Sequence, residues 1–318
     1  MNGSPAIQAT RWPRRHPLAC FFTLAIMLTW ANWVPRALVS HGLSDVRVPD
    51  FLAPLAGYGP ALAALILTGV ISGRAGLLRL GQRLCRWRVG IRWYAVALFL
   101  PAAQAFTALG LHLLFGGELH RPSEVPTLPV GSPGTALWLK ALLLILMFTL
   151  GFDGLGEELG WRGFALPRLL ARYPALGASV ALAAIWALWH LPYVLTERSA
   201  MAHGPFYTYL PRMFATSILF TWLFNNTRGS ILLAILFHAT GNVTANVLPV
   251  LMPGGHASGI WEEIVRWIVV GAVVVMEGPR HLSRKLPAEI EEAFAEPGAA
   301  PNTRVENLGV TEGPPSVS

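Results

Sequence analysis

The chain has 318 residues, of which 53% are hydrophobic and 13% are charged, and its mean hydropathy is +0.49. A soluble domain carries about a quarter charged residues, so this composition excludes an ordinary soluble domain and indicates an integral membrane protein. The net charge is +7, but the basic residues lie between apolar runs and form no single stripe, a distribution typical of membrane topology signals that argues against a nucleic-acid partner.

A basic segment, residues 1–17, precedes the first apolar run. That run is long, contains Trp30 and Trp33 and lacks a convincing small-residue cleavage site, so we expect a retained span and not a signal peptide. A transmembrane helix needs about 20 mostly apolar residues, and runs this long without alternating polar residues exclude a membrane barrel. The sequence therefore predicts an all-α, polytopic bundle of about eight transmembrane helices, with residues 18–277 as the membrane-embedded domain. The expected spans are approximately 18–37, 51–72, 92–116, 135–165, 178–197, 206–226, 229–251 and 260–277.

Arginine and lysine gather in alternate loops: the N-terminus, the loop after the second span, and the segments after the fourth, sixth and eighth spans. This asymmetry predicts that both termini face the cytoplasm, and we expect the membrane to be a bacterial inner membrane. The stretch Leu77–Trp87 interleaves leucine with arginine, which fits either an amphipathic helix on the inner leaflet or a basic topogenic loop. Residues 278–318 are rich in Pro, Glu, Gly and Ser and are expected to form a disordered cytoplasmic tail.

The fourth run carries Glu157, Glu158 and Arg162. An ionisable group inside a span costs about 2.5–3.5 kcal/mol on insertion scales and is a functional hypothesis by default. Glu158 and Arg162 are four residues apart on one helix face, so we expect them to pair and to support the site. Glu157 gains no such cation, and a carboxylate in a poorly solvated site can act as a base near neutral pH. The alternative is that both glutamates mark a cytoplasmic helix end, where charge is cheap.

Two later runs carry His190, His238 and Asn242. Taken singly, each fits a satisfied structural group or a hydrogen bond between helices. If the fifth helix starts near Ala181, then Glu157, His190 and His238 all lie about 14 Å from the inner ends of their helices. We therefore expect the acid, the two imidazoles and the carboxamide to share one pocket.

In chain order these residues form the motifs Glu157-Glu158-x-x-x-Arg162, Trp186-x-x-x-His190 and His238-x-x-x-Asn242. The pattern resembles that of the CAAX-protease and bacteriocin-processing (CPBP) family of intramembrane glutamate endopeptidases, whose three motifs lie on separate membrane helices. The resemblance covers about residues 134–252, the motif-bearing core. The family often has Phe where this chain has Trp186, and its pattern does not require Asp153, whose role stays open.

The resemblance implies an intramembrane peptidase that activates water without a metal or other cofactor. Glu157 would be the general base, and His190 would orient the water or share its proton. His238 and Asn242 would donate hydrogen bonds to the developing tetrahedral oxygen, which is the arrangement that acyl transfer needs. The implied partners are membrane lipid and a peptide or membrane-anchored protein substrate, cleaved near the cytoplasmic side.

Two alternatives stay open. Glu157, His190 and His238 are acceptable zinc ligands, although the sequence has no His-Glu-x-x-His motif. The second alternative is a non-enzymatic scaffold, bacteriocin-immunity protein or transporter, because the motifs do not separate these roles from proteolysis.

Overall fold

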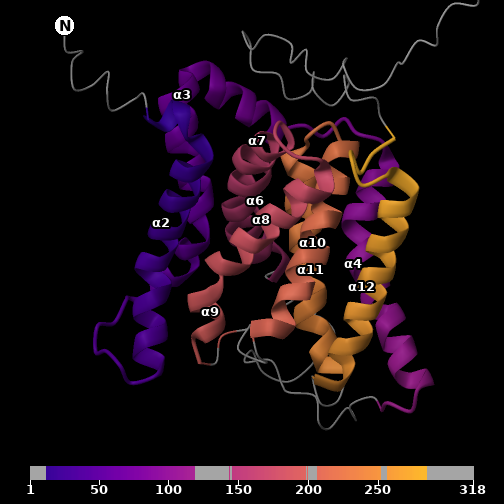
Figure 1. Cartoon of the computed structure of the whole chain (residues 1–318). Helices are drawn as coiled ribbons and strands as arrows, with labels where there is room; N and C mark the ends of the chain where they lie inside the picture. The colour runs from indigo at the N-terminus through magenta and orange to yellow at the C-terminus, as the bar shows by residue number, and fades with distance from the viewer. Residues whose placement is uncertain are drawn as a thin grey trace, which may run out of the picture.

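The computed structural model describes residues 12–118, 143, 145–197, 199, 206–251 and 256–284. Every regular element within these ranges is helical, so the predicted all-α bundle is confirmed (Figure 1). The elements are α2 (Pro17–Ser40), η1 (Asp50–Tyr58), α3 (Gly59–Leu84), α4 (Ile91–Leu114), η2 (Thr149–Gly154), α6 (Leu155–Gly160), η3 (Trp161–Ala165), α7 (Leu166–Leu170), α8 (Ala175–Trp189), α9 (Leu191–Leu195), α10 (Phe206–Asn226), α11 (Ile231–Leu251) and α12 (His256–Glu277).

Three stretches of the described chain are long and apolar enough to cross a membrane: Pro17–Ser40, Asp50–Leu84 and Ile91–Leu114. Their surfaces carry large apolar side chains that stay exposed within the described chain, such as Met27, which is 59% exposed, and Phe99, which is 66% exposed. Many exposed large apolar side chains are unfavourable in water but favourable against lipid. The architecture is therefore that of a helical membrane bundle.

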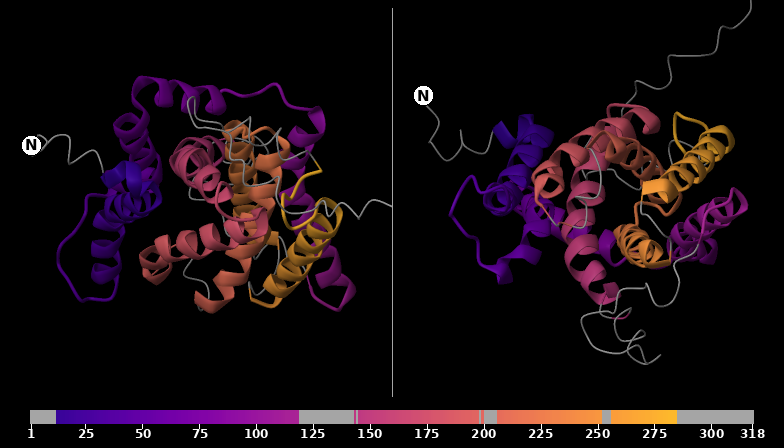
Figure 2. Two further views of the ribbon diagram at one scale, coloured as in Figure 1. Left: turned by 45° about the horizontal axis from the view of Figure 1, so that its top comes forward. Right: turned by 90° about the horizontal axis from the view of Figure 1, so that it is seen from below.

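Helix α3 differs from the predicted span 51–72 at both ends. Residues Asp50–Tyr58 form a 3-10 segment, and the α-helix starts only at Gly59 and continues to Leu84. Gly73 has a φ of 58°, a left-handed conformation that glycine adopts at little cost, and it kinks the helix there. The part after the kink runs across one end of the bundle (Figures 1 and 2). It contains most of the Leu77–Trp87 stretch, which is helical to Leu84.

The arginine-rich loops that the sequence assigned to one side of the membrane do lie at one end of the bundle. Arg83 donates hydrogen bonds to the carbonyl oxygens of Arg162 and Gly163 at 2.9 and 3.0 Å. Arg228, in the turn between α10 and α11, donates to the carbonyl oxygen of Arg88 at 2.8 Å. Two of these carbonyls belong to η3 and the third to the loop between α3 and α4, so the arginines tie separate parts of that end of the bundle together.

The start of α8 corrects the prediction that the fifth helix begins near Ala181. The helix begins at Ala175. The N–H groups of Ala175 and Leu176 donate to the carbonyl oxygens of Arg280 and Pro279 at 2.8 and 3.0 Å. The first N–H groups of a helix have no partner within the helix, and here the segment after α12 supplies two acceptors.

The prediction that His190 lies about 14 Å from the inner end of its helix assumed a start near Ala181 and is therefore wrong. Helix α8 starts at Ala175, so fifteen helical residues precede His190. The motifs meet for another reason. Helices α7 and α8 are joined by a short turn at residues 171–174, so the two flanking stretches form a hairpin. Glu157 and His190 lie at similar distances along the chain from this turn, which brings them side by side.

Residues 278–284 of the predicted tail are part of the folded bundle. The side-chain amides of Asn225 and Asn226 donate to the carbonyl oxygens of His281 and Leu282 at 2.7 and 2.9 Å. The rest of the predicted tail lies outside the described residues.

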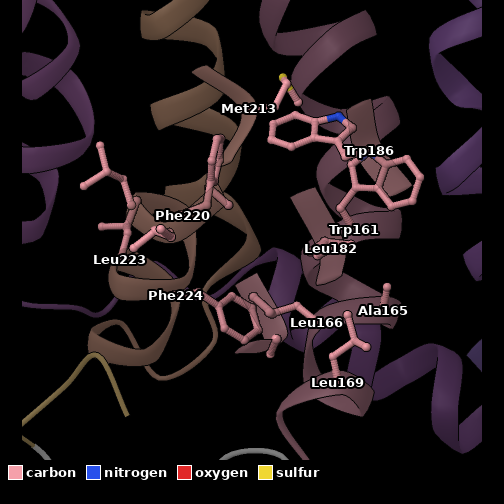
Figure 3. Close-up of a cluster of buried hydrophobic side chains, with 14 of the residues drawn as sticks. Trp161, Ala165, Leu166, Leu169, Leu182, Trp186, Met213, Phe220, Leu223 and Phe224 are labelled. Carbon is pink, nitrogen blue, oxygen red and sulfur yellow. The ribbon is translucent and has the colours of Figure 1, made fainter. Parts of the chain in front are cut away.

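The core beside the site is aromatic and leucine-rich. Trp161, Leu182, Phe220 and Phe224 are each at most 2% exposed. They fill the space enclosed by three parts of the bundle, which are the η3–α7 segment, α8 and α10 (Figure 3). This packing holds the motif-bearing helices in a fixed relation to one another.

Two glycines allow α6 to approach η1 and the start of α3 closely. A Cβ at Gly160 would lie 2.6 Å from the carbonyl oxygen of Pro60, and one at Gly156 would lie 2.7 Å from the carbonyl oxygen of Gly57. Small residues spaced by four allow such backbone contact between membrane helices. The contact fixes the position of the two glutamates between these glycines.

We expect Gly160→Ala to lower the free energy of unfolding by about 1–3 kcal/mol, since the added methyl group has to displace backbone. Gly110→Ala in α4 is the matched control, because a Cβ at Gly110 meets nothing within 4 Å. The measurement is equilibrium unfolding in mixed micelles. Equal stability of the two variants would contradict the close contact between α6 and α3.

Candidate active site

Glu157 and Glu158 lie in α6, a short α-helix between the π-helical stretches η2 and η3. Such π-turns are rare and occur frequently at functional sites. Glu157 is 5% exposed and Glu158 is fully buried. The alternative that these glutamates mark a solvated helix end is therefore wrong, because both lie inside the bundle.

Glu158 lies at the centre of a buried network of ionisable side chains, between Arg162 and His238. Its Oε1 accepts a hydrogen bond from Nη1 of Arg162 at 2.9 Å, which confirms the predicted pairing within the helix. The same oxygen lies 2.7 Å from Nδ1 of His238 on α11. Glu158 therefore joins the first motif to the third, a role that its spacing from Arg162 alone did not indicate.

Arg162 is fully buried, and its guanidinium packs against two aromatic rings. The ring centroids of Trp186 and Phe220 are 4.4 and 3.8 Å from Cζ of Arg162. Figure 3 shows these two rings facing the same region between α8 and α10. Arginine stacks on aromatic faces in this way because its planar cation is weakly hydrated.

The two carboxylate oxygens of Glu157 have different surroundings. Oε2 accepts hydrogen bonds from the indole N–H groups of Trp186 at 2.6 Å and Trp161 at 3.3 Å. Oε1 lies 3.9 Å from Nε2 of His190 and 3.9 Å from Nε2 of His238. These two distances are longer than a hydrogen bond but within the reach of one bridging water.

His190 lies at the junction of α8 and α9. Its Nδ1 is 3.0 Å from the carbonyl oxygen of Trp186, and a carbonyl oxygen can only accept, so Nδ1 carries the proton. In a neutral imidazole Nε2 is then the acceptor, and it faces Glu157. The rings of Trp189 and Tyr209 pack edge-on against the imidazole with centroids at 4.5 and 5.8 Å.

Asn242 contacts a residue whose role the sequence left open. Its Nδ2 donates a hydrogen bond to Oδ2 of Asp153 in η2 at 2.9 Å. The carboxylate has no hydrogen to donate, so this contact fixes the orientation of the carboxamide. Asn242 therefore reaches the stretch just before the glutamates.

The structure thus places Nε2 of His190 and Nε2 of His238 each 3.9 Å from Oε1 of Glu157. It connects Asn242 to the same region through Asp153. The contacts that Trp161 and Trp186 make with Glu157 were missed. The available signal was the spacing of four between Glu157 and Trp161, which places an indole N–H on the same helix face. Across the described ranges, no group of three His, Cys, Asp or Glu side chains is arranged to hold a metal ion.

Residues 138–244 match the profile of the family described as type II CAAX prenyl endopeptidase Rce1-like. A CAAX prenyl protease 2 from Methanococcus maripaludis is 31% identical over 131 residues, which cover 38% of this chain and 45% of the relative. The match thus spans less than half of the relative's length. The matched family segment contains all three motifs, so the resemblance that the motifs indicated is confirmed.

Proposed function

Because its motif-bearing segment matches the Rce1-like CAAX prenyl endopeptidases, we propose that this protein is an intramembrane peptidase that uses Glu157 to activate water. The observation that carries the proposal is the position of Oε1 of Glu157, 3.9 Å from Nε2 of both His190 and His238. A water held by these three atoms has a base on one side and two imidazoles on the other.

In the proposed first step, the water oxygen attacks the carbonyl carbon of the scissile peptide, and Oε1 of Glu157 takes one water proton. His190 orients the water, because its Nε2 accepts the hydrogen bond of the other O–H. The carbonyl π electrons move onto oxygen and form a tetrahedral oxyanion. Glu157 then gives its proton to the leaving nitrogen, the C–N bond breaks, and a carboxyl product and an amine are released.

His238 and Asn242 are proposed to stabilise the oxyanion. His238 lies between the carboxylates of Glu157 and Glu158, and its Nε2–H is proposed to donate to the oxyanion. The carboxamide of Asn242, which contacts Asp153, is proposed to donate beside it. Arg162 compensates the charge of Glu158, so that this carboxylate keeps its place behind His238.

The proposed substrate is a peptide anchored in the membrane, and the arginine-rich end of the bundle is proposed to face the cytoplasm. The named relative is a CAAX prenyl protease, which suggests an S-farnesylated peptide ending in Cys-a-a-X as the first probe, where a is aliphatic. The same peptide without the isoprenoid is the second probe. Both are presented to the purified protein in liposomes, and products are identified by mass spectrometry.

Comparative proteomics of membrane peptides in cells with wild-type or Glu157→Gln protein tests the proposal without assuming a substrate. We expect peptides that are shortened in wild-type cells to persist at full length in the variant. A scaffold or immunity protein keeps its phenotype when this carboxylate is replaced. Identical peptide patterns in both strains would contradict the proposed activity.

Treatment with a chelator such as EDTA is expected to leave peptide hydrolysis unchanged, since the proposed base is a carboxylate and not a metal-bound hydroxide. Activity is measured before and after dialysis against the chelator, and again after zinc is added. Loss on chelation with recovery on addition of zinc would favour the zinc-dependent alternative.

A further inference from the structure

Trp161 and Trp186 approach Glu157 from two different elements. Trp161 belongs to η3 and Trp186 to α8, yet both indole N–H groups donate to the same oxygen, Oε2. The three side chains are at most 5% exposed. An indole donates one hydrogen bond and accepts none in its plane, so the carboxylate is the partner that these buried N–H groups need.

This pair of hydrogen bonds sets the plane of the Glu157 carboxylate. With Oε2 held by two donors, the other oxygen, Oε1, points toward His190 and His238. A partial rotation of the carboxylate about its last bond would weaken both hydrogen bonds and turn Oε1 away from the imidazoles. The carboxylate is therefore kept in one orientation before any substrate binds.

Trp186 links the base to the first imidazole through a single residue. Its indole N–H donates to Glu157, and its backbone carbonyl accepts the hydrogen bond from Nδ1 of His190. The spacing of four residues makes the second contact possible within one helical turn. The positions of Oε1 and of Nε2 of His190 are consequently set by the same residue.

The indole of Trp186 is itself held in place. The guanidinium of Arg162 lies over its ring at 4.4 Å, and the ring of Phe220 packs against it edge-on with centroids at 5.8 Å. Figure 3 shows the Trp186 ring beside Phe220 and Met213, with its nitrogen on the side away from Leu223 and Phe224. A donor fixed by packing needs little reorganisation when the carboxylate acts.

We propose that Trp186, assisted by Trp161, is a positioning residue that aims Oε1 of Glu157 at the water held by the two imidazoles. The proposal depends on the proposed role of Glu157 as the base. A phenylalanine ring at position 186 would fill similar space but would offer no N–H to Glu157.

The first test is the steady-state kinetics of Trp186→Phe with the farnesylated Cys-a-a-X peptide in liposomes. We expect kcat to fall about 10- to 100-fold, the range for losing a hydrogen bond to a charged group, while KM changes less than about two-fold because the substrate is not touched. Trp161→Phe, which loses the longer contact, is expected to lower kcat less. Trp222→Phe is the matched control, since the buried N–H of Trp222 meets no hydrogen-bond partner in the described chain.

The second test reads the hydrogen bond directly and needs no activity. The protein is labelled with ¹⁵N at tryptophan, and its indole N–H resonances are recorded in micelles. The Trp186 signal is assigned by its absence in Trp186→Phe. If that variant does not fold, selective labelling gives the assignment. In Glu157→Gln, whose amide oxygen is a weaker acceptor, this signal is expected to move while that of Trp222 stays in place. A Trp186 resonance that does not respond to Glu157→Gln would overturn the proposal.

The outcomes also separate this inference from the proposed function. If Glu157→Gln abolishes turnover but Trp186→Phe keeps the wild-type kcat, the peptidase assignment stands and the positioning role is wrong. If Glu157→Gln itself keeps full turnover, the proposed base is wrong, and the positioning role fails with it.

Discussion

Replacement of Glu157 by glutamine is expected to lower kcat for peptide hydrolysis by about two to four orders of magnitude, the range for losing a general base. Glutamine keeps the shape of the side chain and can still accept a hydrogen bond from the indole of Trp186. Its carboxamide does not take a proton from water, so the first step of the proposed reaction is lost. The measurement is kcat of the purified variant in liposomes with the farnesylated peptide.

Glu262→Gln is the control for this experiment. Glu262 is a carboxylate of α12, outside the three motifs, and it pairs with Arg212 at 3.6 Å and with Arg266 at 3.8 Å. We expect this variant to retain the wild-type kcat. A Glu157→Gln protein that turns over as fast as Glu262→Gln would show that the base has been assigned wrongly.

Replacement of Arg162 by methionine is expected to lower the free energy of unfolding by about 3–5 kcal/mol, the usual cost of removing one partner of a buried ion pair. Arg162 and Glu158 are both fully buried and 2.9 Å apart. Without the guanidinium, Glu158 keeps a buried charge that His238 alone has to compensate. The loss is measured by equilibrium unfolding in mixed micelles.

The double variant Glu158→Gln with Arg162→Met distinguishes an unpaired charge from lost packing. Because it has no uncompensated carboxylate, we expect it to be more stable than Arg162→Met alone. Asp50→Asn, which removes the solvent-exposed partner of Arg36, is expected to leave stability nearly unchanged. A double variant that is less stable than the single one would mean that the ion pair is not what Arg162 contributes.

The sequence predicted the helical class and several helix boundaries well. The span predicted at 206–226 coincides with α10, and the spans at 18–37 and 229–251 lie within three residues of α2 and α11. Apolar runs bounded by turns or charges determine where such helices lie. The pairing of Glu158 with Arg162 was also predictable, because it depends only on helical spacing.

The errors and omissions come from interactions between distant parts of the chain. The start of α8 depends on carbonyl groups of Pro279 and Arg280, about a hundred residues further along the chain, and hydropathy carries no information about them. The contacts of Asp153 with Asn242, and of Trp186 with Glu157, likewise join separate helices. The π-turns on both sides of α6 have no sequence signature that we could use.

Glu157 and His190 are proposed to act on one water molecule, and the kcat values of Glu157→Gln, His190→Ala and the double variant decide whether they do. If both residues serve the same proton transfer, the double variant is no slower than the slower single variant, as for catalytic residues that act as a unit. If instead the two losses multiply in the double variant, the residues act independently and the shared site is contradicted.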